Sequence, residues 1–186
     1  MAVLVTASPI LPGSKAFVKK IRELCPNITT IVQNINPRST SAVLGDKEKI
    51  LYGKGYITDS LCGVKFRIAP SSFYQVNPKQ TEILYQKAIE AAGLNGKQTV
   101  LDAYCGVGTI GLTAAKHAKS VLGVELNQSA VRCAVENAKE NHLGNARFLC
   151  GDATRFIQKL ATEESIWTWS LWTRPEQAAL RNFSRR

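Results

Sequence analysis

The chain has 186 residues and a mass of 20.4 kDa, which allows one ordinary domain and part of a second. A hydrophobic fraction of 45% and a mean hydropathy of −0.09 are typical of a globular protein and exclude a disordered one. The net charge of +10 is concentrated in residues 1–97, which carry 13 Lys or Arg against 6 Asp or Glu. This excess suits a polyanionic partner such as RNA, although lysine also serves solubility.

Membrane insertion and secretion are not expected. The longest apolar runs fall far short of the roughly 18 residues of a membrane span, and residues 1–5 lack the charged flank and length of a signal peptide. The five cysteines are odd in number and contain no C-x-x-C pair, which argues against a zinc site, an iron–sulfur site or a disulfide framework. We therefore expect no metal and a location in the reducing cytoplasm.

Residues 1–76 are expected to form a small α+β domain. Apolar residues at helical spacing predict a helix over 14–25, which Pro26 ends. Runs of β-branched residues and a glycine turn at 61–63 predict strands, and the polar segment 38–49 is expected to be a loop. The expected strands are residues 1–6, 27–36, 54–60 and 64–68.

From residue 77 to 164, strands alternate with helices. Asn77 and Pro78 begin a helix that runs to Ala92, with an apolar side made of Ile83, Leu84, Ala88 and Ala91. Three strand–helix units follow, with strands at 99–102, 120–125 and 146–149 and helices at 109–117, 128–141 and 152–160. Alternation with short loops predicts a parallel, doubly wound α/β sheet of the Rossmann-like kind. Three strands leave that sheet incomplete.

The last segment, residues 165–186, does not continue this pattern. It holds all three tryptophans within six positions and shows no helical or strand periodicity. A sheet of only three strands leaves an exposed edge, and we expect that a dimer could cover it.

A strand running into a glycine turn carries the first motif, V-L-D-A-Y-C-G-V-G-T-I-G at 100–111. Gly106, Gly108 and Gly111 match the dinucleotide fingerprint, and Glu125 follows Asp102 by 23 positions, so a nicotinamide or flavin cofactor is one interpretation. Against it, the charge of Asp102 would oppose a pyrophosphate. The same charge would attract the sulfonium and ammonium groups of S-adenosylmethionine.

Two further acids follow the next strands. Glu125 can accept hydrogen bonds from vicinal ribose hydroxyls, and Asp152 can accept from an adenine amino group. Both would face the crevice where such folds bind ligands. The alternative is that Asp152 only caps a helix and Glu125 is a surface charge. Cys105 is expected to be a packing residue.

The ordered motifs S-F-Y-Q-V-N-P (72–78), L-D-A-Y-C-G-V-G-T-I-G-L, G-V-E and G-D-A closely resemble the bacterial RNA (uracil-5-)-methyltransferase family. The upstream I-V-Q-N-I-N and L-Y-G-K-G-Y-I-T-D also resemble its central domain, so the likeness covers roughly residues 1–164. The resemblance implies S-adenosylmethionine as cofactor and assigns its contacts to Gln75, Tyr104, Thr109, Glu125 and Asp152. With the turn residues, the expected cofactor-binding set is Gln75, Asp102, Tyr104, Gly106, Gly108, Thr109, Glu125 and Asp152.

The resemblance implies methylation of C5 of a uridine, with 23S ribosomal RNA expected before transfer RNA. In that chemistry a cysteine thiolate adds to C6, the resulting enolate attacks the methyl group, and a base removes the C5 proton. The family's S-C-N-P cysteine, its glutamate base, its D-P-P-R segment, its N-terminal β-barrel and the iron–sulfur cysteines of some members are all missing from this sequence. We therefore expect no catalytic residues here and an inactive fragment.

The last segment, which we call the tail, offers an explanation for the missing catalytic segments. Read two bases later, with permitted wobble bases, residues 165–185 become a hydrophobic strand followed by D-P-P-R, so our hypothesis is a frameshift near residue 164. Two other functions stay open. One is a non-catalytic RNA-binding or assembly module with a vestigial cofactor pocket, and the other is an NAD-dependent oxidoreductase.

Overall fold

The computed structural model describes residues 1–39, 41–162, 169–174 and 177–182, with side chains through residue 160. The chain divides into two compact units. The first contains residues 1–57 and 68–71, and the second contains residues 58–67 and everything described from residue 72 onward. A segment that we expected in the first domain, residues 58–67, is thus part of the second unit.

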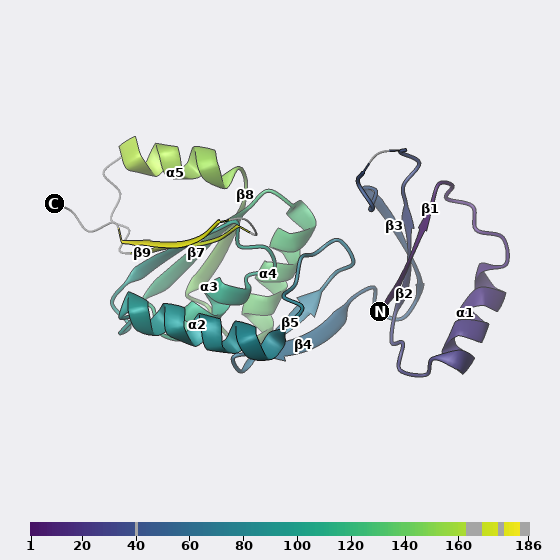
Figure 1. The fold of residues 1–186 in the computed structure, drawn as a ribbon, viewed down its shortest axis with the longest axis horizontal. Helices are drawn as coiled ribbons and strands as arrows, with labels where there is room; N and C mark the ends of the chain where they lie inside the picture. Colours follow the sequence, from purple (N-terminus) through teal and green to yellow (C-terminus); the bar gives the residue numbers. More distant parts are fainter. Residues whose placement is uncertain (40, 163–168, 175–176, 183–186) are drawn as a thin grey trace. The chain divides into compact units, whose positions relative to one another are not determined.

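The first unit is a three-stranded sheet with one helix. Strand β1 (Ala2–Thr6) pairs in parallel with β2 (Ile31–Ile35), and helix α1 (Ser14–Leu24) makes the connection between them (Figure 1). Strand β3 (Lys47–Tyr52) pairs antiparallel with β2. The expected loop at 38–49 is therefore partly wrong. Because β3 is an edge strand with exposed charged side chains, its composition resembles that of a loop.

Buried polar side chains hold the loops of this unit to β2. Gln33 is fully buried, and its Nε2 donates to Thr6 Oγ1 at 2.9 Å and to the Ser8 carbonyl at 3.1 Å. Asn34, also fully buried, exchanges hydrogen bonds of 3.0 and 2.7 Å with the backbone of Gly45. Since neighbouring residues of a strand point to opposite faces, the pair secures a loop on each side.

The second unit is built on a five-stranded sheet with the order β10-β9-β6-β7-β8. Strands β6 (Thr99–Ala103), β7 (Ser120–Glu125) and β8 (Ala146–Cys150) are parallel, as predicted. Strand β9 (Trp169–Arg174) pairs in parallel with β6, and β10 (Gln177–Asn182) pairs antiparallel with β9. The expectation that the tail adds no strand is wrong, because Trp and Thr favour strands and β6 offers an edge to pair with.

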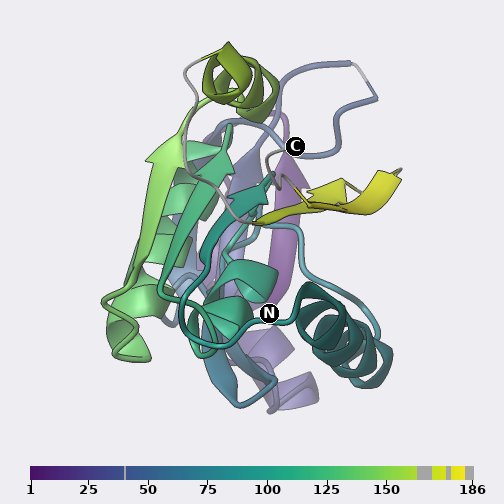
Figure 2. The ribbon, with the colours of Figure 1, turned by 90° about the vertical axis from the view of Figure 1, so that its left-hand side faces the viewer.

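Helices cover both faces of this sheet, which confirms the Rossmann-like fold. Figures 1 and 2 show α5 (Ala153–Thr162) on one face and α2 (Pro78–Ala92), α3 (Thr109–Ala115) and α4 (Gln128–Glu140) on the other. Chain order runs from β6 through β7 to β8 and then returns across the sheet to β9. The order therefore reverses between β6 and β9, and in such sheets ligands bind beside this reversal, at the carboxyl ends of the strands.

Helix α2 starts and ends as predicted, but it buries a different face. The Asn77 side chain accepts a hydrogen bond from the Gln80 amide at 3.3 Å, and Gly93 ends the helix with a φ of 58°. Ile83 and Leu84 are 51% and 58% exposed, while the buried residues are Thr81, Tyr85, Ala88 and Ala92. The expected apolar side is corrected accordingly.

The second unit also contains a hairpin, β4 (Ile57–Leu61) and β5 (Val64–Ile68). Its turn residues Cys62 and Gly63 have φ values of 51° and 67°, the left-handed pair that a two-residue hairpin turn requires. Among the described residues, no helix is long and apolar enough to cross a membrane. In the same part of the chain, no three His, Cys, Asp or Glu side chains gather as a metal site would need.

Candidate functional site

A pocket of about 460 Å³ lies in the second unit where β6, β7 and β8 end. Its volume falls in the range of small-molecule sites. Six of the eight predicted residues line it: Gln75, Tyr104, Gly106, Thr109, Glu125 and Asp152. The other lining residues are Phe73, Tyr74, Tyr85, Cys105, Val107, Leu126, Ala153 and Thr154. Asp102 and Gly108 do not line it.

Glu125 ends β7 and faces the pocket with a carboxylate that is already anchored. Its Oε2 accepts from the Gly106 amide at 3.1 Å, and its Oε1 accepts from the Asn127 amide at 2.8 Å. Each carboxylate oxygen has a second lone pair. The group is therefore held in place by the backbone and can still accept hydrogen bonds from a ligand.

Asp152 follows β8 and caps α5. Its Oδ1 accepts from the amides of Thr154 at 2.8 Å and Arg155 at 3.3 Å, while Oδ2 lies 3.8 Å from Arg155 Nε. Asp152 also lines the pocket. The capping role of Asp152 is therefore confirmed, and the cap holds this carboxylate at the pocket wall.

Two hydroxyl pairs close the sides of the pocket. Tyr104, directly after β6, has a φ of 62°, and its hydroxyl lies 2.6 Å from Thr154 Oγ1. A left-handed backbone at a tyrosine is strained, and such strain gathers at functional sites. Thr109 Oγ1 lies 2.8 Å from the hydroxyl of Tyr85, which reaches over from α2. Burial raises the pKa of Tyr85 to about 12, so it stays a phenol.

Tyr85 is a pocket residue that sequence reasoning missed. It is 2% exposed and lies at i+4 from Thr81 and i−3 from Ala88. That spacing could have indicated its burial, although not its pocket role, but the more hydrophobic Ile83 and Leu84 outweighed it.

The amides of the three glycines in the turn are occupied by the protein itself. Gly106 donates to Glu125, Gly108 donates to the Cys105 carbonyl at 2.8 Å, and Gly111 donates to Asp102 Oδ2 at 2.9 Å. A pyrophosphate site needs such amides free. Among the described lining residues, moreover, none is Lys, Arg or His. The three glycines that match the dinucleotide fingerprint in sequence thus have amides that already bond within the protein.

Asp102 lies behind the turn rather than in the pocket. It is fully buried on the central strand, in register with Gly123 of β7 and Leu171 of β9. Burial is the largest cause that raises the pKa of this carboxyl to about 8. At neutral pH it is therefore mainly protonated, which corrects the expectation that its charge attracts a positive ligand. Its role is to hold the amide of Gly111, where a Cβ would lie 2.6 Å from Oδ2.

Gly108 likewise shapes the turn from outside the pocket. Its φ is 84°, and a Cβ there would lie 3.0 Å from the ring of Phe148. Cys105 is buried beside it, and burial, with smaller contributions from Asp102 and Glu125, raises the pKa of its thiol well above the usual value. Cys105 is therefore a neutral packing thiol.

The aromatic side of the pocket comes from the segment before α2, which supplies Phe73, Tyr74 and Gln75. The ring of Tyr74 lies 6.4 Å from that of Phe66 in β5, at an interplanar angle of 53°. Such a tilted contact is favourable between aromatic rings. The hairpin thereby supports this side of the pocket.

Comparison with known proteins identifies relatives over most of the chain. The family model for tRNA (uracil-5-)-methyltransferase matches residues 26–167. A protein of Halalkalibacterium halodurans, named an uncharacterized RNA methyltransferase, is 46% identical over 157 residues, which cover 84% of this chain and 34% of that protein. One of the same name from Enterococcus faecalis is 48% identical over 160 residues, or 86% of this chain and 35% of that protein. The chain thus spans about a third of the length of these relatives.

Two solved structures resemble this chain over most of its length. Pyrococcus abyssi tRNA (uracil-54, C5)-methyltransferase in complex with S-adenosyl-L-homocysteine is 29% identical, with a TM-score of 0.64 over 81% of this chain and 35% of that one. A SAM-dependent methyltransferase from Agrobacterium tumefaciens, 22% identical, shares the fold with a TM-score of 0.57 over 81% of this chain and 47% of its own. On the match of the family model and of these relatives, the chain belongs to the tRNA (uracil-5-)-methyltransferase family.

Proposed function

We propose that the pocket binds S-adenosylmethionine, and that the chain is the cofactor-binding part of an enzyme that methylates C5 of a uridine in RNA. The observation that carries this proposal is a pair of carboxylates, Glu125 at the end of β7 and Asp152 just after the neighbouring parallel strand β8. Both line one pocket, whose lining contains no cationic residue in the part of the chain that the structure describes. This pair of acceptors fits a ligand that brings hydroxyl and amino hydrogens and a positive charge, but no phosphate.

The described residues have distinct parts in this binding. Glu125 accepts hydrogen bonds from the ribose hydroxyls, and Asp152 accepts from the adenine amino group. Gln75, Tyr104 and Thr109 complete the contacts, and Gly106 lets the backbone approach the ligand. When bound, the cofactor supplies a methyl group activated by its sulfonium.

We further propose that this chain binds the cofactor without transferring the methyl group, because the expected nucleophile and base segments are missing from its sequence. We propose 23S ribosomal RNA as the substrate of the enzyme, in preference to transfer RNA. The basic first unit is the proposed contact with RNA. A cytoplasmic location is part of this proposal, and the five free cysteines suit a reducing compartment.

Titration calorimetry with S-adenosylhomocysteine and with NAD tests the cofactor. We expect saturable binding of S-adenosylhomocysteine, no binding of NAD, and at least a tenfold loss of affinity in Glu125→Gln, about 1.4 kcal/mol. Glu90→Gln is the matched control, since Glu90 forms an exposed ion pair with Lys87 outside the pocket. Binding of NAD, or an affinity unchanged in Glu125→Gln, would contradict the proposal.

The frameshift hypothesis and the expected division into residues 1–76, 77–164 and 165–186 also remain proposals. The match to the family model ends at residue 167, close to the expected shift. The nucleotide sequence of the parent gene tests it, because the shifted frame should run on through D-P-P-R to the missing cysteine. Early stop codons in every other frame would refute the shift.

A further inference from the structure

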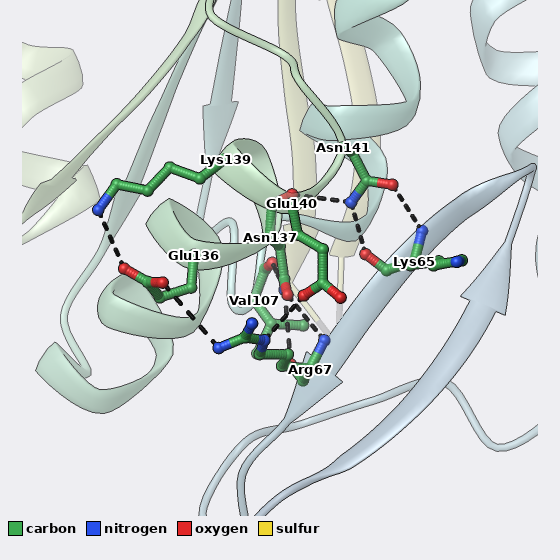
Figure 3. Close-up of polar contacts among 8 residues, drawn as sticks. All are labelled: Lys65, Arg67, Val107, Glu136, Asn137, Lys139, Glu140 and Asn141. Atoms are coloured by element: carbon green, nitrogen blue, oxygen red, sulfur yellow. Dashed lines mark hydrogen bonds and ion pairs between the residues drawn. The ribbon is translucent and has the colours of Figure 1, made fainter.

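Asn137 of α4 and Asn141, which caps the end of that helix, pair with the edge of β5 much as a neighbouring strand would (Figure 3). Asn137 Oδ1 accepts from the Arg67 amide at 2.7 Å, and Asn137 Nδ2 donates to the Arg67 carbonyl at 3.4 Å. Asn141 does the same for Lys65, at 2.9 and 2.7 Å. The geometry allows this because four helical residues rise about 6 Å and two strand residues about 6.6 Å.

Asn137 makes one contact that Asn141 does not. Its Nδ2 also donates to the carbonyl of Val107 at 3.1 Å, and the whole residue is buried. Val107 stands inside the glycine turn and lines the pocket. The corresponding donor of Asn141 returns instead to the carbonyl of Asn137 in its own helix, at 2.7 Å. One carboxamide thus ties β5 to the turn, while the other ties β5 only to α4.

The strand held by Asn137 also supports the aromatic side of the pocket. Phe66 lies between the two paired residues, is fully buried and contacts the ring of Tyr74, which lines the pocket. The Arg67 guanidinium strengthens the attachment, with Nε 2.8 Å from Glu140 Oε2 and Nη1 4.0 Å from Glu136 Oε2. The position of β5 therefore affects where the aromatic side stands.

We propose that Asn137 is a positioning residue for the cofactor pocket. Its carboxamide holds the glycine turn and the edge of β5 at a set spacing, so that the turn and the aromatic side supported by Phe66 face each other correctly. The inference rests on the proposed function, because it concerns the same pocket. It predicts that the loss of Asn137 weakens cofactor binding beyond its effect on stability.

The test compares Asn137→Ala with Asn141→Ala, which removes the matching strand contacts but leaves Val107 untouched. Both variants should lower the unfolding midpoint. At a temperature where both are folded, the Kd for S-adenosylhomocysteine should rise about tenfold or more in Asn137→Ala and stay within about twofold in Asn141→Ala. Equal Kd values in the two variants would overturn the inference, whereas a wild-type chain that binds no S-adenosylhomocysteine would overturn the proposed function and the inference with it.

A second measurement needs no variant, and it therefore tests the inference even where Asn137→Ala fails to fold. Coupling between two sites is reciprocal, so the ligand should stabilise the contacts of Asn137 in return. In hydrogen exchange of the unaltered chain, S-adenosylhomocysteine should slow the Arg67 amide several-fold more than the Lys65 amide. Equal protection of the two amides would refute the positioning role.

Discussion

The buried carboxyl of Asp102 should make the chain less stable as the pH rises. In the folded chain burial raises its pKa from 3.8 to about 8, so the folded state keeps a proton that the unfolded state has already lost. Unfolding then releases a proton between these two values. The free energy of unfolding must therefore fall with pH across that window and level off above about pH 8.

The size of the effect follows from the shift. One unit of pKa corresponds to about 1.4 kcal/mol, so the loss approaches that value for each pH unit and totals at most roughly 6 kcal/mol above pH 8. This is a large part of the stability of an ordinary domain. Asp102→Asn is neutral at every pH and keeps an oxygen to accept from the Gly111 amide. It should remove this contribution.

Urea unfolding followed by circular dichroism at pH 5, 6, 7 and 8 measures both chains. Relative to the wild type, Asp102→Asn should gain roughly 3–4 kcal/mol between pH 5 and pH 8. Glu90→Gln, an exposed change, should leave the wild-type slope as it is. A difference between Asp102→Asn and the wild type that does not change with pH would refute the reasoning about the buried, protonated carboxyl.

Two further outcomes can be checked directly. Gly111→Ala should lower the free energy of unfolding by about 2 kcal/mol or more, because the new Cβ would lie 2.6 Å from Asp102 Oδ2. Gly144→Ala is the control and should change the urea midpoint little, because no atom lies within 4 Å of its Cβ. Equal midpoints in the two variants would contradict this prediction. In fluorescence anisotropy with a short RNA, reversing the exposed charges of Lys15 and Lys19 on α1 should weaken binding and reduce the slope of log K against log salt by about one per lost contact. A charge reversal on α2 is the control, and an equal effect there would argue against α1.

Local patterns were sufficient to predict most elements of the second unit. The helices α2, α3, α4 and α5 and the strands β6, β7 and β8 lie within two residues of their expected bounds. Their signals are capping residues, glycine turns and short apolar runs, all of which act within one element. The failures concern pairing. Strand β3 and the tail strands β9 and β10 depend on a neighbouring edge, which a local pattern does not contain.

The residues of the candidate site likewise separate into those that the sequence could predict and those that it could not. Glu125 and Asp152 could be placed at the pocket from the sequence, because a residue at or just beyond the end of a parallel strand lies at the carboxyl edge wherever that strand sits in the sheet. The pocket role of Tyr85 could not, since its hydroxyl meets Thr109 across 24 residues of chain. Neither could the proposed positioning role of Asn137, whose side chain meets Arg67 across 70 residues of chain.

The sequence by itself thus determined the order of elements, the glycine turn and the acids beside it, because these depend on residues close together along the chain. Only the tertiary structure decided what those groups can do. The same aspartate that suggests a charge in the sequence is buried on a central strand, and the missing solvent keeps it protonated. The amides that suggest a phosphate site are already bonded to Glu125, Cys105 and Asp102. Solvation and partners, which set this chemistry, exist only once distant segments have packed together.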